Sequence, residues 1–282
     1  MRMTISSQKP YTGELATEAD RIARQEAKPK LSKTSKMPGK SWSQSAWETC
    51  PGARNDDGSP VSACSFCYAL TGAYQFPGTI AARKHNESDW QKNGWVRAMI
   101  KEIKGMKYFR WFDSGDINSV VLAGKIWAVI ASTPDTMHWL PTRSHKDKAI
   151  AYRLEGIRNL SNVVVRYSSD SREGERLDST LYPNNSTIIQ SKDDFIPEKG
   201  VALCRSGERG GKCGSCRACW STNVTTVAYI HHGNKVGDNK FEKDLILVEG
   251  GGHALRKSFA RKHLKFLKFI LDMTGGDGIM LS

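Results

Sequence analysis

The sequence of 282 residues lacks several features whose absence narrows its function. No apolar run approaches the ~20 residues that a membrane-spanning helix needs, so we expect no membrane partner. The first ten residues, MRMTISSQKP, hold no apolar stretch after their charge, so we expect no secretory signal and a cytoplasmic location. The chain also contains no G-x-S-x-G elbow, no Walker loop and no H-E-x-x-H helix, which mark serine hydrolases, nucleotide-binding proteins and zinc peptidases.

The number of cysteines in the sequence is odd. There are seven, so they cannot all pair in disulfides. In a reducing compartment, clustered cysteines indicate metal or redox chemistry rather than covalent staples. The seven fall into a C-terminal group of four and an N-terminal group of three.

The C-terminal group comprises Cys204, Cys213, Cys216 and Cys219, within CRSGERGGKCGSCRACW. The spacing C-x2-C-x2-C matches the first three ligands of bacterial ferredoxin clusters, and Cys204 can complete the ligands of a 4Fe-4S cluster. A single zinc ion is the alternative. Zinc sites usually show two separated C-x2-C pairs, so we favour a cluster.

The N-terminal group comprises Cys50, Cys64 and Cys67, with the spacing C-x13-C-x2-C. Three thiolates suit a 4Fe-4S cluster with one open iron, which can bind a cofactor or act as a Lewis acid. Two other interpretations stay open. Cys50 can be a small buried apolar residue, and one cluster can draw on both groups.

Alternating strand and helix patterns predict an α/β fold. Residues 1–45 are polar and basic and contain prolines, so we expect a basic extended arm with one short helix at 16–27. Residues 46–282 are expected to form a single α/β cluster-binding domain. Its helices are predicted at 77–105, at 119–131 with Asn118 or Ser119 as the cap, at 146–157 and at 252–272. Its strands are predicted at 108–112, 137–140, 162–167, 186–190, 201–203, 224–231 and 244–248.

A parallel sheet built in this way, open or barrel-like, binds ligands beyond the C-terminal ends of its strands. Polar residues follow the predicted strands where such a site needs them. They are Asp113, Ser114, Gly115 and Asp116; Thr142, Arg143 and Ser144; Ser168, Ser169 and Asp170; Gln190 and Ser191; and Cys204. Arg143 and Arg166 fall near or within buried strands. Each is therefore expected to face a ligand anion or cluster, or else a structural carboxylate of Asp113, Asp116 or Asp170.

The net charge is +13, and basic residues concentrate at 23–40 and 256–268. A cationic surface attracts anions, including nucleic acid. A solvated tail and a solvated helix face account for the same excess, and we favour this interpretation over a nucleic-acid groove.

The sequence CSFCYA resembles the end of the radical S-adenosylmethionine motif, in which an aromatic residue, here Phe66, precedes the last cysteine. The stretch W-x2-C-x13-C-x2-C-Y-A, together with CGSCRACW, resembles phage proteins of the gene-product-88 type over residues 37–232. This resemblance implies a 4Fe-4S cluster. It also implies a partial (β/α) barrel of the radical-SAM-like kind, with cysteine-rich loops and a C-terminal helix.

The sequence departs from the radical S-adenosylmethionine pattern in two places. Those enzymes usually carry C-x3-C-x2-C, whereas the first gap here is thirteen residues. Their Gly-Gly-Glu-like motif, which binds the amino group of the cofactor, is replaced by the stretch Asp113 to Asp116. Because this stretch occupies the similar place, with Asp116 where the acid would be, the resemblance implies that Ser114, Gly115 and Asp116 bind S-adenosylmethionine.

Three functions follow from these features. We favour a phage enzyme of the host cytoplasm that uses the open iron in a radical-SAM-like reaction, with a reductant still to be identified. The first alternative is a hydrolase or lyase with a Lewis-acid iron, in which Asp113, Asp116 or a histidine is the general base and Arg143 a further catalytic residue. The second is a nucleic-acid-binding protein with a structural cluster or zinc.

Overall fold

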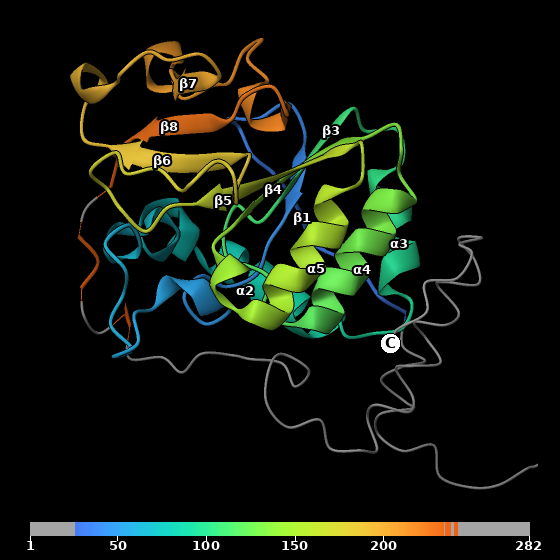
Figure 1. The fold of residues 1–282 in the computed structure, drawn as a ribbon. Coiled ribbons are helices and arrows are strands. Elements are labelled where there is room, and N and C mark those ends of the chain that lie inside the picture. The colour runs from blue at the N-terminus through green and yellow to red at the C-terminus, as the bar shows by residue number, and fades with distance from the viewer. Residues whose placement is uncertain (1–25, 234, 238–239, 242–282) are drawn as a thin grey trace, which may run out of the picture.

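The computed structural model describes residues 26–233, 235–237 and 240–241. These residues contain one sheet of eight strands. The strands lie in the spatial order β1-β2-β3-β4-β5-β6-β8-β7 (Figure 1). Their bounds are β1 Leu31–Lys33, β2 Lys40–Trp42, β3 Tyr108–Trp111, β4 Met137–Thr142, β5 Val163–Ser168, β6 Asn185–Ile189, β7 Val201–Cys204 and β8 Thr226–Ile230.

The sheet is parallel except at one edge. Neighbouring strands from β2 onward all pair in parallel, and β1 runs antiparallel to β2. The C-terminal ends of the parallel strands therefore meet at one edge of the sheet, as the sequence predicts. The predicted alternation of strands and helices is confirmed from β3 to β5. The predicted strands β6, β7 and β8 are also present, with no α-helix in the described residues between them, and element ends differ from the predictions by a few residues.

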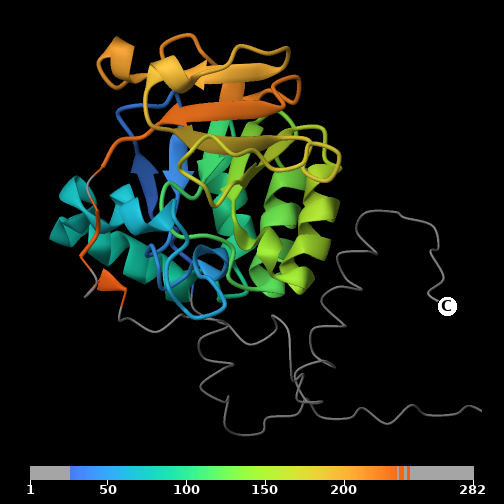
Figure 2. The same ribbon diagram turned by 60° about the vertical axis from the view of Figure 1, so that its left-hand side comes forward.

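Helices cover one face of the sheet over β2 to β5, whereas β6, β8 and β7 extend beyond them (Figures 1 and 2). In β3, Phe109 and Trp111 join the apolar core under these helices, and Tyr108 and Arg110 point to the opposite face. The helices are α2 Pro77–Asp89, α3 Trp95–Ile103, α4 Val120–Ala131 and α5 Lys148–Arg158. Short 3-10 helices are η1 Pro51–Ala53, η2 Cys64–Phe66, η3 Tyr68–Leu70, η4 Gly72–Gln75, η5 Ser144–Lys146, η6 Lys192–Asp194, η7 Gly207–Arg209 and η8 Ala218–Trp220.

The single helix predicted at 77–105 is wrong, because the structure divides it into α2 and α3. The buried ammonium group of Lys125 in α4 donates hydrogen bonds to three successive carbonyl groups at this break, those of Trp90, Gln91 and Lys92. A helix end leaves its last carbonyl groups without partners inside the helix. A distant lysine therefore stabilises a break that helical periodicity does not predict.

The sheet is not closed into a barrel. Strand β8 enters between β6 and β7, so β7 forms one edge, and the antiparallel β1 forms the other. The predicted α/β class is confirmed. The barrel part of the prediction is not, because among the described residues both edge strands pair on one side only.

The stretch assigned to the basic arm contributes two strands, β1 and β2, to the sheet. Trp42 in β2 is fully buried, and its ring packs edge-on against Trp95 of α3 at 5.2 Å between centroids. The helix predicted at 252–272 and the strand predicted at 244–248 lie outside the described residues, as does most of the helix predicted at 16–27. Among the residues described, none of the helices has the length and hydrophobicity needed to span a bilayer.

Candidate functional site

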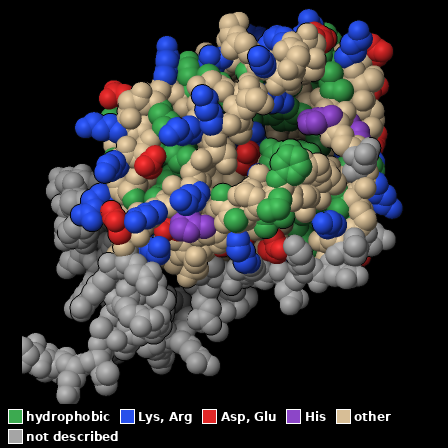
Figure 3. Space-filling model, turned by 180° about the vertical axis from the view of Figure 1, so that it is seen from behind, with side chains coloured by type: hydrophobic (Ala, Val, Ile, Leu, Met, Phe, Trp, Pro, Cys, Tyr) green, Lys and Arg blue, Asp and Glu red, His purple; other side chains and the backbone are tan. Residues whose placement is uncertain are grey.

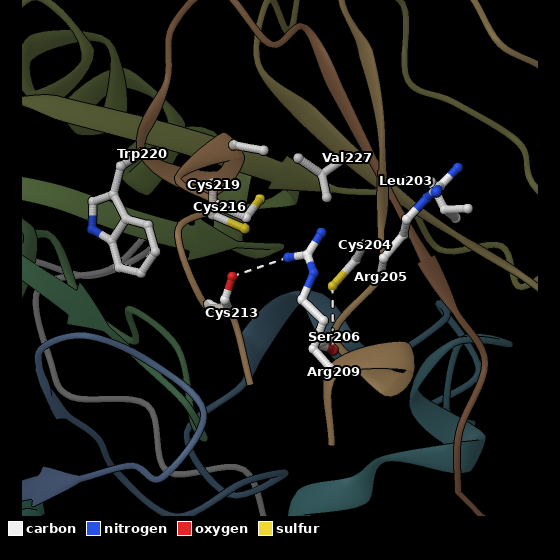
Figure 4. Close-up of a pocket in the computed structure, with 11 residues that line it drawn as sticks. Leu203, Cys204, Arg205, Ser206, Arg209, Cys213, Cys216, Cys219, Trp220 and Val227 are labelled. Carbon is white, nitrogen blue, oxygen red and sulfur yellow. Dashed lines mark hydrogen bonds between the residues drawn. The ribbon is translucent and has the colours of Figure 1, made fainter. Parts of the chain in front are cut away.

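The four C-terminal cysteines line one pocket beside the edge strand β7. Figure 4 shows Cys204, the last residue of β7, on one side of this pocket, with Cys216 and Cys219 on the other. The main-chain N–H of Cys213 donates to the carbonyl of Lys36 at 2.8 Å, which fastens the cysteine loop to the connection between β1 and β2. The fold thus brings together the four thiols that the sequence predicts as one ligand set.

Two side chains from the sheet hold the far end of this loop. The hydroxyl of Tyr229 in β8 lies 3.3 Å from Sγ of Cys219, and Cys204 stands opposite Tyr229 in the pairing of β7 with β8. The guanidinium of Arg166 in β5 donates to the main-chain carbonyls of Asn185, Ala218, Ser221 and Val224. Within the described part of the chain, the hydrogen-bond partners of Arg166 are carbonyl groups, so the predicted carboxylate partner is wrong.

Burial is the largest influence on the pKa of two of these thiols, those of Cys219 and Cys213. It raises the pKa of Cys219 to about 11, and the hydrogen bond from Tyr229 and the charge of Arg166 oppose that rise. Burial also raises the pKa of Cys213, against the lowering effect of Lys36. Because a metal binds the thiolate, loading of this pocket must release protons, and the nearby cations stabilise the anions that result.

The three N-terminal cysteines gather at the C-terminal edge of the sheet. Cys50 precedes η1, Cys64 begins η2, and Cys67 separates η2 from η3. Burial raises the pKa of Cys50 well above its ordinary value, and the negative charges of Asp116, Cys67 and Cys64 raise it further. Burial also raises the pKa of Cys67 to about 12. These effects on Cys50 reflect how closely the three thiols lie together.

The long gap between Cys50 and Cys64 is closed by local structure. Arg54 and Pro60 form an antiparallel bridge within it, so the loop returns on itself. Gly52 then lets η1 touch the sheet, because a Cβ at this position would lie 2.0 Å from the carbonyl oxygen of Arg143. The loop between Cys50 and Cys64 therefore folds so that Cys50 lies next to the end of β4.

Arg143, directly after β4, contacts this group of thiols. Its Nη1 lies 3.1 Å from Sγ of Cys64, and its Nη2 donates to the carbonyl of Ser169 at 2.6 Å. Its Nε lies 3.0 Å from Oδ1 of Asp170. The arginine thus combines an ion pair with an acid, one of the alternatives that the sequence leaves open, with a contact to a thiol that the sequence predicts as a cluster ligand.

Asp116 is buried beside the same thiols and accepts three hydrogen bonds. The donors are the main-chain N–H groups of Ile117 at 2.8 Å and Arg143 at 2.7 Å, and the hydroxyl of Thr142 at 2.8 Å. Burial raises the pKa of Asp116, and these donors oppose the rise. The carboxylate therefore joins the ends of β3 and β4 next to Cys50.

The other predicted residues of this stretch bind the segment that follows β2. Asp113 accepts a hydrogen bond from the hydroxyl of Ser43, and the hydroxyl of Ser114 donates to the carbonyl of Gln44 at 2.5 Å. Gly115 has φ +73°, and a Cβ there would lie 2.9 Å from the same carbonyl oxygen of Gln44. These contacts fix the main chain, and the predicted cofactor-binding role of Ser114 and Gly115 stays a prediction.

Neither cysteine group has the geometry of a single-ion site. Among the described residues, no three His, Cys, Asp or Glu side chains are grouped so that they could hold one metal ion. In a 4Fe-4S cluster each thiolate binds a different iron, so the thiols stand farther apart than around one zinc ion.

A cavity of about 330 Å³ lies at the C-terminal ends of β4 and β5. Its lining includes His145, Lys146, Asp170 and Tyr182. Asp170 lies 2.8 Å from Nζ of Lys146 and also pairs with Arg143, so this cavity is two contacts away from Cys64. Burial lowers the pKa of His145 to about 4, which keeps its ring neutral at pH 7.

Sequence reasoning missed Arg110 in β3. Its guanidinium lies over the ring of Trp139, 4.3 Å from the centroid, and its Nη2 donates to the hydroxyl of Tyr68 at 3.2 Å. The signal for it was present in the sequence, because Arg110 alternates with Phe109 and Trp111 in a predicted strand. A charged residue at such a position faces away from the helix-covered core.

Lys and Arg side chains are spread over the face opposite to the view of Figure 1, with fewer acidic side chains among them (Figure 3). This distribution agrees with the net charge of +13. It does not select between a solvated surface and a nucleic-acid groove, and the nucleic-acid partner stays a prediction.

Comparison with known proteins identifies one family. No curated protein and no solved structure matches the chain. A family model described as Gene product 88 matches residues 9–222. The match includes all seven cysteines and every strand but β8, and it agrees with the resemblance to gene-product-88-type phage proteins drawn from W-x2-C-x13-C-x2-C-Y-A and CGSCRACW. Because it covers most of the sequence, the chain belongs to the gene product 88 family.

Proposed function

We propose that this chain is an iron–sulfur enzyme with two 4Fe-4S clusters. Cys204, Cys213, Cys216 and Cys219 would bind a closed cluster, and Cys50, Cys64 and Cys67 a cluster with one open iron. The observation that supports this most directly is the gathering of three thiols, one buried and two half-buried, at the ligand-binding edge of a parallel sheet, next to Arg143.

A cluster with one open iron supplies a place where a cofactor such as S-adenosylmethionine can bind and be reduced. The residues of the chain would prepare that place. Arg143 stabilises the thiolate of Cys64 through its contact at 3.1 Å, and it is itself held by Asp170. A hydrogen bond to a ligand sulfur raises the reduction potential of a cluster, because it offsets the charge of the reduced state.

The cavity at the ends of β4 and β5 is the proposed substrate site. It lies where α/β sheets bind their ligands, and Asp170 connects it through Arg143 to Cys64. Its lining carries hydroxyl groups of Ser168 and Ser171 and the ion pair between Lys146 and Asp170. Such a lining suits a small polar molecule.

The radical-SAM-like assignment extends this proposal to the fold. Successive parallel strands with helices on one face, and thiols at the C-terminal edge, are what a partial barrel of that kind would present. A phage origin of the enzyme is part of the same proposal and rests on the resemblance to phage proteins of the gene-product-88 type.

Anaerobic purification with iron and sulfide analysis tests the clusters. Two matched double variants divide them: Cys213→Ser with Cys216→Ser, and Cys64→Ser with Cys67→Ser. Each variant is expected to lose about half of the iron and sulfide and to keep the spectrum of the other cluster, which also shows that the chain is folded. Stoichiometric zinc without sulfide, or iron unchanged in both variants, would contradict the proposal.

Release of methionine from S-adenosylmethionine tests the radical-SAM-like reaction. The reduced wild-type protein and the C-terminal double variant are compared with the N-terminal double variant. We expect cleavage to require Cys64 and Cys67. A fully loaded, reduced protein that leaves S-adenosylmethionine intact would remove this part of the proposal and leave the two clusters standing.

A further inference from the structure

Arg110 contacts the residue that follows the last cysteine of the N-terminal group. Tyr68 directly follows Cys67, and its hydroxyl accepts a hydrogen bond from Nη2 of Arg110 at 3.2 Å. The same hydroxyl donates to the main-chain carbonyl of Asp113 at 3.0 Å, so two hydrogen bonds hold the tyrosine side chain in place. Tyr68 therefore connects the guanidinium to the segment that carries the N-terminal thiols.

Arg110 also reaches the C-terminal group through two tryptophans. Its guanidinium lies over the ring of Trp139, and this ring contacts Trp220 at 5.2 Å between centroids. Trp220 directly follows Cys219 and is held by a hydrogen bond from its Nε1 to the carbonyl of Phe109 at 3.0 Å. The two cysteine groups are thus joined by one continuous set of contacts, with Arg110 in the middle.

Burial lowers the pKa of Arg110, but the charges of Tyr68 and Asp113 raise it above its ordinary value, so the surroundings favour the charged guanidinium. Its Nη1 meets only the thioether sulfur of Met37, at 3.7 Å, and its Nε is buried without a hydrogen-bond partner among the described residues. The nearby carboxylate of Asp113 accepts a hydrogen bond from the hydroxyl of Ser43, and its Oδ1 lies 3.8 Å from Nη2 of Arg83. The hydrogen-bond partners of Arg110 among the described residues include no carboxylate, so its guanidinium, which lies between the two cysteine groups, can also interact with negative charge that develops in either group.

We propose that Arg110 is a shared counter-ion of the two clusters and raises the reduction potential of both. This inference rests on the proposed function, because it requires both clusters. Reduction adds one negative charge to a cluster, so a buried cation close to it favours the reduced form. A single guanidinium between two clusters acts on both.

Arg110→Met tests the inference, because methionine keeps most of the apolar stem and removes the charge. Arg143→Met and Arg166→Met are the matched controls, since Arg143 contacts Cys64 and Arg166 lies near Cys219. Anaerobic redox titration followed by EPR measures both midpoint potentials in each protein. We expect Arg110→Met to shift both potentials to more negative values, and each control to shift chiefly one.

Iron and sulfide counts on the same samples distinguish a failure of the two-cluster function from a failure of the role proposed for Arg110. Wild-type protein without sulfide means that the two-cluster function fails. Two intact clusters with one or neither potential shifted in Arg110→Met overturn the shared counter-ion. If Arg110→Met loses a cluster, Arg110→Lys, which keeps the charge, should retain both. Loss in the lysine variant too would overturn the electrostatic role.

Discussion

At the scale of single residues, Asp116 has contacts that favour a structural role over the predicted role of general base. Its buried carboxylate accepts from three donors, so Asp116→Asn turns an amide N–H₂ group toward a donor. A buried donor left without a partner costs about 1–3 kcal/mol, so we expect a loss of that size in the free energy of unfolding, measured with urea.

The matched control is Asp178→Asn, because Asp178 also accepts hydrogen bonds from a neighbouring threonine but is exposed. We expect this variant to unfold as the wild type does. If Asp116→Asn kept full stability and lost only activity, the catalytic role would stand and the structural one would be wrong.

The buried ring of His138 predicts how stability depends on pH. Its Nδ1 accepts a hydrogen bond from Nε1 of Trp111 at 3.3 Å, its Nε2 lies 2.9 Å from Oγ1 of Thr133, and burial lowers its pKa to about 3. Below the ordinary pKa of 6.5, the His138 ring binds a proton in the unfolded chain but stays neutral in the folded protein. The free energy of unfolding should therefore fall as pH falls, by about 1.4 kcal/mol per unit for this group.

His138→Gln isolates this contribution. Urea unfolding of wild type and variant between pH 6.5 and pH 5, above the range where most carboxylates titrate, should give a shallower loss of stability in the variant. The buried His145, whose pKa is also lowered, contributes to both slopes and cancels in the difference. Equal slopes would show that His138 titrates normally in the folded protein.

At the scale of elements, the docking of η1 on the end of β4 decides whether Cys50 reaches its group. Gly52→Ala places a methyl group against the carbonyl oxygen of Arg143, and overpacking of this kind costs about 1–3 kcal/mol. We expect lower iron content in the N-terminal site and an unchanged EPR signal from the C-terminal site.

Gly78→Ala is the control for this substitution. Gly78 lies in α2, and a Cβ there meets no atom within 4 Å, so alanine should be neutral or stabilising. Gly52→Ala with a full N-terminal cluster would mean that the loop can carry Cys50 to its group from another position.

At the scale of the whole molecule, the two cysteine segments contain little regular structure of their own. Between residues 47 and 75, and between 205 and 225, the regular structure consists of short 3-10 helices and the isolated bridge between Arg54 and Pro60. Removal of iron by a chelator under oxidising conditions should therefore lower the melting temperature and expose both segments to proteases, because metal binding stabilises only the folded state. The helix-covered strands β3 to β5 should stay protected.

Limited proteolysis with mass spectrometry measures this difference between cluster-loaded and chelated protein. Cleavage sites are expected first in the segment from 205 to 219, where glycines flank the cysteines. An identical melting temperature and identical fragments before and after loss of iron would show that the clusters contribute nothing to the fold.

The sequence by itself determined the elements that depend on local chemistry. Period-two alternation and apolar runs marked β3, β4 and β5, and the cap of α4 is confirmed, since the side chain of Ser119 accepts from the N–H of Leu122 at 3.0 Å. The spacing of Cys213, Cys216 and Cys219 grouped these thiols, because residues so close in sequence stay close in any fold. Polar residues at strand ends marked the edge where a site lies.

Only the tertiary structure decided which distant groups meet. The contact of Arg143 with Cys64, the place of Cys204 on the edge strand beside β8, and the position of Arg110 between the two cysteine groups all depend on strand order. Strand order is fixed by pairing and packing over the whole sheet, which leaves no local mark in the sequence. The break between α2 and α3 has the same origin, since it depends on a lysine more than thirty residues away.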